Sequence, residues 1–181
     1  MLAVALIPGA HAQGFRVRPR IAPQELRCIR WAAYHYYKPT DPMTLQGFID
    51  LLVAVRMTEG GRVGHISWNR NHTYDIGPMQ INSTHLAQLQ RFGISYDAVL
   101  NNACENIVVG AWILHANLAE SHDLWTSIGN YNTGSFNART WRSNITYQRL
   151  IWQHLQTIWA AKLTRGNETA ASSGDVAEAT Q

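Results

Sequence analysis

Glu59 is the residue whose place in the sequence most strongly suggests acid–base chemistry. It ends an apolar helical pattern and directly precedes Gly60-Gly61, where glycine readily adopts the left-handed conformation that terminates a helix. A carboxylate there lies near the negative end of the helix dipole, and burial beside Met57 or an aromatic ring would further disfavour its ionised form. Both effects raise the pKa, as a general acid near neutral pH requires. A glutamate at a helix end is more often a solvated surface residue, so the remaining sequence must decide.

Polar and aromatic segments follow Glu59 and carry a family resemblance. They read Asp75-Ile-Gly-Pro-Met-Gln-Ile-Asn-Ser83 and Ser127-Ile-Gly-Asn-Tyr-Asn-Thr-Gly134, with Tyr147 in the last helical pattern. In this order they resemble the lysozyme-like superfamily, and most closely the small lytic transglycosylases (SLT domain) encoded with conjugation, type IV and type III secretion systems. The resemblance covers about residues 26–159, and four short motifs in the right order make it specific.

The resemblance implies a role for each matching residue. Glu59 corresponds to the single catalytic acid of the family, and Gln80 to a glutamine that lines the cleft beside it. Tyr131 corresponds to a tyrosine close to the acid and the sugar, in a turn shaped by Asn132. Tyr147 corresponds to a further cleft tyrosine. The chain departs from the family pattern after Glu59, where many members carry a serine instead of Gly60, and at Pro78, where a larger apolar residue is usual.

The side chains of these segments also suit sugar binding on chemical grounds. N-acetyl and ring oxygens require amide and hydroxyl partners, and the apolar side of a pyranose packs on aromatic faces. Groups of these kinds are supplied by Trp68, Gln80, Asn82, Asn130, Tyr131, Asn132 and Tyr147. Asparagines also form turn hydrogen bonds, and tyrosines with satisfied hydroxyl groups also occur in cores. Both alternatives stay open.

Asp75 leaves the reaction type open. Retaining glycosidases use two carboxyl groups roughly 5–5.5 Å apart, and the segment around Asp75 also resembles the part of hen-type lysozyme that carries the second carboxylate. A lytic transglycosylase instead uses its glutamate twice, first as an acid and then as a base for the muramic C6 hydroxyl, which gives a 1,6-anhydro sugar. Asp75 would then only stabilise the cationic transition state or cap a turn. The whole resemblance favours the transglycosylase.

The elements that must position these residues are mainly helices. Proline, capping and glycine signals with helical apolar spacing predict helices at about 23–37, 42–59, 83–92, 102–118, 123–130 and 143–163. Asp41 is the predicted N-cap of the second helix, with Pro42 at its first position, and Ser83 is the predicted cap of the third. Residues 62–78 are irregular with room for a small hairpin. We predict a mainly α, lysozyme-like α+β fold: a helical bundle with a small irregular or β-hairpin insertion after the helix of Glu59.

Length and composition indicate one domain. The 181 residues are 46% hydrophobic, which excludes a largely disordered chain. Residues 1–12 end in Ala10-His11-Ala12 and resemble a signal-peptide cleavage region. We therefore expect export to the periplasm, a lysozyme-like domain at 20–164, and a disordered tail at 165–181.

Two cysteines and the charge balance narrow the class further. Cys28 and Cys104 lie in separate predicted helices, either as small buried hydrophobic residues or, in an oxidising compartment, as a disulfide. The family resemblance favours the disulfide, because some secretion-associated members carry a cysteine pair at the corresponding positions. The net charge of +3 suits an anionic partner, but no nucleic-acid motif is visible and we expect no nucleic acid. No histidine or cysteine spacing predicts a metal, and we expect no cofactor.

The sequence therefore predicts a periplasmic peptidoglycan lytic transglycosylase, with catalytic Glu59 and peptidoglycan glycan strands as its substrate. We expect a monomer that works with components of a secretion or conjugation apparatus. One alternative is a hydrolytic muramidase using Glu59 and Asp75. Another is a non-catalytic peptidoglycan-binding assembly module, which the retained Gln80 and Tyr131 disfavour.

Overall fold

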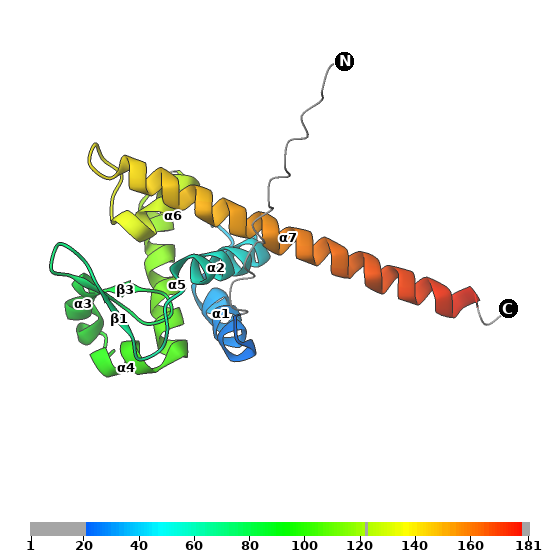
Figure 1. Ribbon diagram of the computed structural model, residues 1–181, viewed down its shortest axis with the longest axis horizontal. Helices are drawn as coiled ribbons and strands as arrows, with labels where there is room; N and C mark the ends of the chain where they lie inside the picture. Colours follow the sequence, from blue (N-terminus) through cyan, green and yellow to red (C-terminus); the bar gives the residue numbers. More distant parts are fainter. Residues whose placement is uncertain (1–20, 122, 179–181) are drawn as a thin grey trace, which may run out of the picture.

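The computed structural model describes residues 21–121 and 123–178, with side chains described through Arg165. The predicted leader at residues 1–12 lies outside these residues. Helices and one small antiparallel sheet make up the fold, which confirms the predicted mainly α architecture with a β insertion. The sheet, α3 (Leu86–Arg91) and α4 (Tyr96–Asn101) lie on one side of α5 (Ala103–Glu120), as Figure 1 shows.

The helix that ends in Glu59 packs between two other helices. It is α2 (Leu45–Glu59), which packs against α1 (Pro23–Tyr36) and α7 (Trp141–Glu178). Its side chains Phe48, Leu52 and Val55 are fully buried. Burying such large apolar side chains contributes about 1.5–3 kcal/mol each, so packing fixes the helix and hence the place of Glu59.

The start of α2 differs from the prediction. Thr44 caps the helix, with its hydroxyl accepting a hydrogen bond from the Gly47 N–H at 3.0 Å. The predicted cap, Asp41, instead accepts from the Lys38 N–H at 2.8 Å and closes a separate turn. Aspartate and threonine can each cap a helix or close a turn, and Thr44 is the cap here because the helix begins at residue 45. The predicted end is confirmed, because Gly60 adopts a left-handed conformation with φ of 61°.

A three-stranded sheet follows α2 where the sequence left a hairpin open. Its strands β1 (Ile66–Trp68), β2 (Tyr74–Ile76) and β3 (Ile81–Asn82) are antiparallel in that order. The register places Asp75 between Ser67 on β1 and Asn82 on β3. Strands of two or three residues are too short to show a clear alternation, which explains why the sequence pattern was weak.

The segment after the sheet also differs in detail. The predicted helix at 83–92 is divided into the 3-10 turn η1 (Ser83–His85) and α3. Asn82, not Ser83, caps η1, because the Ser83 hydroxyl accepts a hydrogen bond from the Tyr74 N–H at 3.1 Å. The short helix α4 was not predicted, although Ser95 caps it. Asn102 opens α5 as expected.

The last two helices form the other wall of the fold. Asp123 caps α6 (Leu124–Thr133), which ends at Gly134 with φ of 69°. The long α7 crosses the molecule (Figure 1) and continues to Glu178, past its predicted end near Leu163. It thereby continues into part of the segment at 165–181 for which disorder was predicted.

A disulfide joins the first helix to the long central one. Cys28 of α1 and Cys104 of α5 are bonded, with their Cα atoms 5.2 Å apart. Such a crosslink typically stabilises a domain by about 2–4 kcal/mol. Across residues 21–121 and 123–178, none of the helices combines the length and apolarity needed to cross a membrane.

Candidate active site

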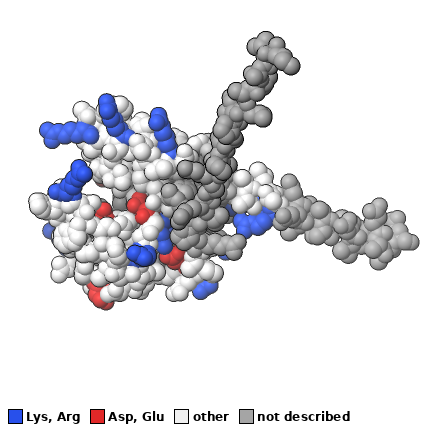
Figure 2. All heavy atoms as spheres, in the orientation of Figure 1, with Lys and Arg blue, Asp and Glu red and all other residues white. Residues whose placement is uncertain are grey.

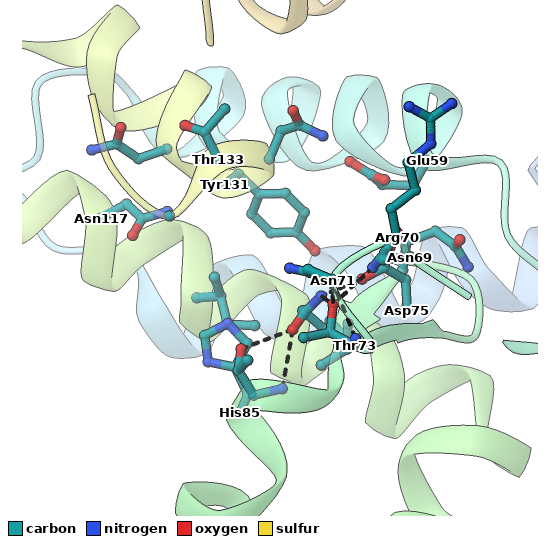
Figure 3. A pocket seen from close by; sticks show the side chains of 18 residues that line it. Glu59, Asn69, Arg70, Asn71, Thr73, Asp75, His85, Asn117, Tyr131 and Thr133 are labelled. Atoms are coloured by element: carbon teal, nitrogen blue, oxygen red, sulfur yellow. Dashed lines mark hydrogen bonds between the residues drawn. The ribbon is translucent and has the colours of Figure 1, made fainter. Parts of the chain in front are cut away.

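A polar cleft of about 580 Å³ lies at the end of α2, between the sheet, α5 and α6. Figure 3 shows Glu59 above, Asp75 and the hairpin residues below it, and the Tyr131 ring beside them near the centre of the view. Glu59, Asp75, Gln80, Asn82, Tyr131 and Asn132, all predicted from the sequence, line it. The remaining polar lining consists mainly of amides and hydroxyls: Asn69, Asn71, Thr73, Thr84, Asn117, Asn130 and Thr133.

Two predicted aromatic residues lie elsewhere. Tyr147 lines an adjoining hollow of about 300 Å³ on α7, which shares Asn132 with the cleft. Trp68 is 70% exposed outside the cleft lining, packed against Tyr74. The structure therefore gathers the polar residues of the prediction but places these two differently.

The surroundings of Glu59 favour its protonated form. Burial, followed by the nearby charge of Asp75, raises the pKa of Glu59 to about 7, although a hydrogen bond from Tyr147 opposes the rise. That bond runs from the Tyr147 hydroxyl to Oε1 of Glu59. A carboxyl group with a pKa close to neutrality can both donate and accept a proton under ordinary conditions. The geometry thus provides an acid–base group at the edge of a polar cleft.

The two tyrosines have separate tasks. Their rings stack with centroids 6.4 Å apart, but the Tyr131 hydroxyl donates to the carbonyl oxygen of Met79 at 2.9 Å. Burial and the charge of Glu59 raise the pKa of both phenols well above the usual value, so both remain hydrogen-bond donors. Tyr147 therefore contacts the carboxylate, whereas Tyr131 fixes the turn that carries Gln80.

Gln80 is held in a constrained turn. Its backbone has a φ of 49°, and its Nε2 donates to the Gly77 carbonyl at 2.8 Å. This turn packs so closely on the segment after α2 that a Cβ at Gly61 would collide with the Gly77 carbonyl. Glycine at 61 thus permits the approach of Gln80 to the end of the Glu59 helix.

Asn106, which no sequence motif indicated, holds the same turn from α5. It is fully buried on α5, where its Oδ1 accepts from the Met79 N–H at 2.7 Å. Its Nδ2 donates to the carbonyls of Ile76 and Val99 at 2.8 and 2.9 Å. A polar residue within the apolar stripe of the predicted helix was the available signal, because a buried amide must find partners.

Asp75 is held by two amide groups. Asn69 Nδ2 donates to its Oδ2 at 2.9 Å, and Asn82 Nδ2 donates to its Oδ1 at 2.7 Å. Asn82 Oδ1 in turn accepts from the backbone N–H and hydroxyl of Thr84. The amide of Asn82 thus positions Asp75, and the direct sugar contact expected of this residue stays a prediction.

Comparison with known proteins agrees with this geometry. The family model of the transglycosylase SLT domain matches residues 50–154, which include the cleft. The chain belongs to this family. It is 34% identical over 112 residues to Invasion protein IagB of Salmonella typhimurium, covering 60% of this chain and 68% of that protein. It is also 35% identical over 86 residues to the X polypeptide of Escherichia coli K12, covering 47% and 51% of the two chains.

Membership of the SLT family makes the chain a lytic transglycosylase that acts on peptidoglycan. The matched residues begin within α2 and end within α7, so the family region contains Glu59 and Tyr147 but not α1 or Cys28. In the part of the chain that the structure describes, no group of three His, Cys, Asp or Glu side chains is arranged to hold a metal ion.

The hydrogen bond between Tyr147 and Glu59 predicts a pH effect. Tyr147→Phe removes the donor that stabilises ionised Glu59, so the pKa of Glu59 should rise above about 7. Because a general acid must be protonated, the alkaline limb of kcat/KM against pH should move upward by about one pH unit. The exposed Tyr34 provides a matched control, Tyr34→Phe, which should leave the profile in place. If the alkaline limb of folded Tyr147→Phe stayed in place or moved to lower pH, this role of Tyr147 would be contradicted.

Proposed function

We propose that the enzyme cleaves the β-1,4 bond between N-acetylmuramic acid and N-acetylglucosamine and forms a 1,6-anhydro-muramic end. Glu59 first protonates the glycosidic oxygen; the bond to C1 breaks, and the leaving sugar departs with the proton. Glu59, now a carboxylate, then accepts the proton of the muramic C6 hydroxyl as that oxygen attacks C1. Glu59 at the cleft, with Tyr147 bonded to its carboxylate and a pKa of about 7, carries the acid–base part of this proposal, because one group must serve as acid and base in turn.

Asp75 supports the first step without a covalent role. Its two amide donors hold its carboxylate in the cleft, close enough to Glu59 to raise the pKa of that residue. A fixed negative charge there stabilises the positive charge that develops at C1 in the transition state.

The same arrangement gives a second candidate, hydrolysis by a pair of carboxyl groups. Mass spectrometry of muropeptides released from purified peptidoglycan separates the two. We expect muramic ends lighter by one water than the reducing sugar, and the same product, formed more slowly, from Asp75→Asn. Reducing ends from the unmodified enzyme would reject the transglycosylase mechanism in favour of the muramidase.

We further propose that the enzyme works in the periplasm for a secretion or conjugation apparatus. The disulfide between Cys28 and Cys104 supports export, because such bonds persist in oxidising compartments. The resemblance to transglycosylases encoded with conjugation and secretion systems supports the link to such an apparatus, and the chain is also similar to a protein named Invasion protein IagB. Fractionation of the native host should recover the oxidised enzyme with periplasmic markers, and recovery of reduced protein with cytoplasmic markers would reject this location.

A further inference from the structure

Arg70 brings a positive charge into a cleft whose other charged lining residues are acids. The lining contains Glu59, Asp75, one histidine and otherwise neutral side chains. Burial lowers the pKa of that histidine, His85, so it is neutral near pH 7. Arg70 is exposed, and within residues 21–121 and 123–165 its guanidinium forms neither an ion pair nor a hydrogen bond. The cleft therefore presents one free cation to whatever it binds.

Hydrogen bonds hold the hairpin turn that carries Arg70. The Asn69 N–H donates to the Thr73 carbonyl at 2.8 Å, and Asn71 Oδ1 accepts from the Thr73 hydroxyl at 2.7 Å. Asn69 also binds Asp75, so this turn is tied to the cleft floor. Figure 3 shows the Arg70 side chain extending from the hairpin toward the side of the cleft that holds Glu59. A fixed base with a free guanidinium suits a ligand contact.

A neutral sugar gives such a cation no charged partner. The amides and hydroxyls of the cleft already match N-acetyl and hydroxyl groups. N-acetylmuramic acid differs from N-acetylglucosamine by a lactyl ether on C3, which ends in a carboxylate or continues into a peptide with its own carboxylates. Guanidinium groups bind carboxylates with strong, charge-assisted hydrogen bonds. In the view of Figure 2, acidic side chains lie in the middle and at the lower edge of the molecule, and basic ones project mainly from its upper and left side.

We propose that Arg70 is a specificity-determining residue that binds a carboxylate of the muramic C3 substituent. This rests on peptidoglycan being the substrate and adds a basis for selecting muramic strands over uncharged chitin-type polymers. Arg70 acts on binding and not on the acid, since the pKa of Glu59 depends on burial, Tyr147 and Asp75.

The test uses the full chain and three soluble ligands of equal sugar number. They are peptide-bearing glycan strands, strands freed of peptide by an amidase, which keep the lactyl carboxylate, and chito-oligosaccharides, which have no carboxylate. The variants are Arg70→Ala, Arg70→Lys and the control Arg91→Ala, which removes an exposed arginine at the end of α3. Measurements are kcat and KM for the strands, inhibition by the chito-oligosaccharide, and a melting curve for each variant.

We expect Arg70→Ala to raise KM about tenfold for a carboxylate-bearing strand, with kcat, its pH profile and chito-oligosaccharide inhibition unchanged. Arg70→Lys should restore part of the loss, and Arg91→Ala should behave like the unmodified enzyme. A rise in KM confined to peptide-bearing strands identifies a peptide carboxylate as the partner of Arg70. A rise confined to the amidase-treated strands identifies the lactyl carboxylate. A loss with both identifies the charge of either substituent.

Three results would overturn the proposal: unchanged KM for both strands, equal weakening of all three ligands, or a fall in kcat with a shifted pH profile. Unchanged KM would mean that Arg70 does not contact the carboxylate. Equal weakening would mean that it contacts the sugar in general, and a shifted pH profile would mean that it acts on Glu59. The products are analysed by mass spectrometry in the same reactions. Reducing ends would reject the proposed mechanism, while the comparison of KM values for Arg70 stays interpretable.

Discussion

Glu59→Gln should lower kcat/KM on purified peptidoglycan by at least about a thousandfold, with the melting temperature little changed. Glutamine keeps the size of the side chain and can still accept the hydrogen bond from Tyr147. It cannot deliver a proton to the glycosidic oxygen or receive one from the C6 hydroxyl. Both halves of the proposed cycle therefore fail, while substrate binding in the cleft persists. The initial rate at which soluble muropeptides are released, measured at several enzyme concentrations, tests this prediction.

The matched control for this variant is Glu120→Gln. Glu120 is also the last residue of its helix, α5, but it is exposed and lies outside the cleft lining. Its replacement should leave activity unchanged, because a helix end alone does not make a catalytic acid. If Glu59→Gln released muropeptides at the rate of Glu120→Gln, Glu59 would not be the acid. The reaction would then have to start from another group in the cleft.

The sequence was most informative where the chemistry depends on local structure. The end of α2 could be predicted because Gly60 terminates a strongly apolar helix, and the position of Glu59 at that end follows. Burial, one of the causes expected to raise the pKa of Glu59, is the largest cause in the structure. The roles of Glu59, Gln80 and the tyrosines came from family resemblance, and they stay predictions until variants are measured.

The contacts that position these residues join segments far apart in the chain, and the sequence pattern could not supply them. Tyr147 lies 88 residues after Glu59, and only the packing of α7 on α2 brings its hydroxyl to the carboxylate. Likewise, an asparagine such as Asn82 has the same chemistry whether it contacts a sugar or holds Asp75. Its place in the sheet register, opposite Asp75, brings its amide to that carboxylate, while a contact with the sugar stays a prediction. Strands this short leave no periodic signal from which that register could be predicted.

Asn106 is the residue for which a large effect on both stability and activity is expected. Asn106→Ala leaves the Met79 N–H and the carbonyls of Ile76 and Val99 without their buried partner. Each unsatisfied buried group costs about 1–3 kcal/mol, so the free energy of unfolding should fall by about 3 kcal/mol or more. The Met79 carbonyl also accepts the hydrogen bond from the Tyr131 hydroxyl, and Met79 precedes Gln80. We therefore expect kcat/KM of the folded protein to fall as well.

Denaturant unfolding and kinetics at a temperature where the variant stays folded separate these two effects. The control is Asn101→Ala, which removes an exposed asparagine amide that donates a hydrogen bond to Asp97 and should cost less than about 0.5 kcal/mol. Gly77→Ala provides an independent route to the same turn, since a Cβ there would press against the Asn106 amide. Both turn variants should lose activity together. If Asn106→Ala lost stability while the folded enzyme kept its full kcat/KM, Asn106 would stabilise the fold without positioning Gln80 and Tyr131. If it lost no more stability than Asn101→Ala, the buried amide would not hold the turn at all.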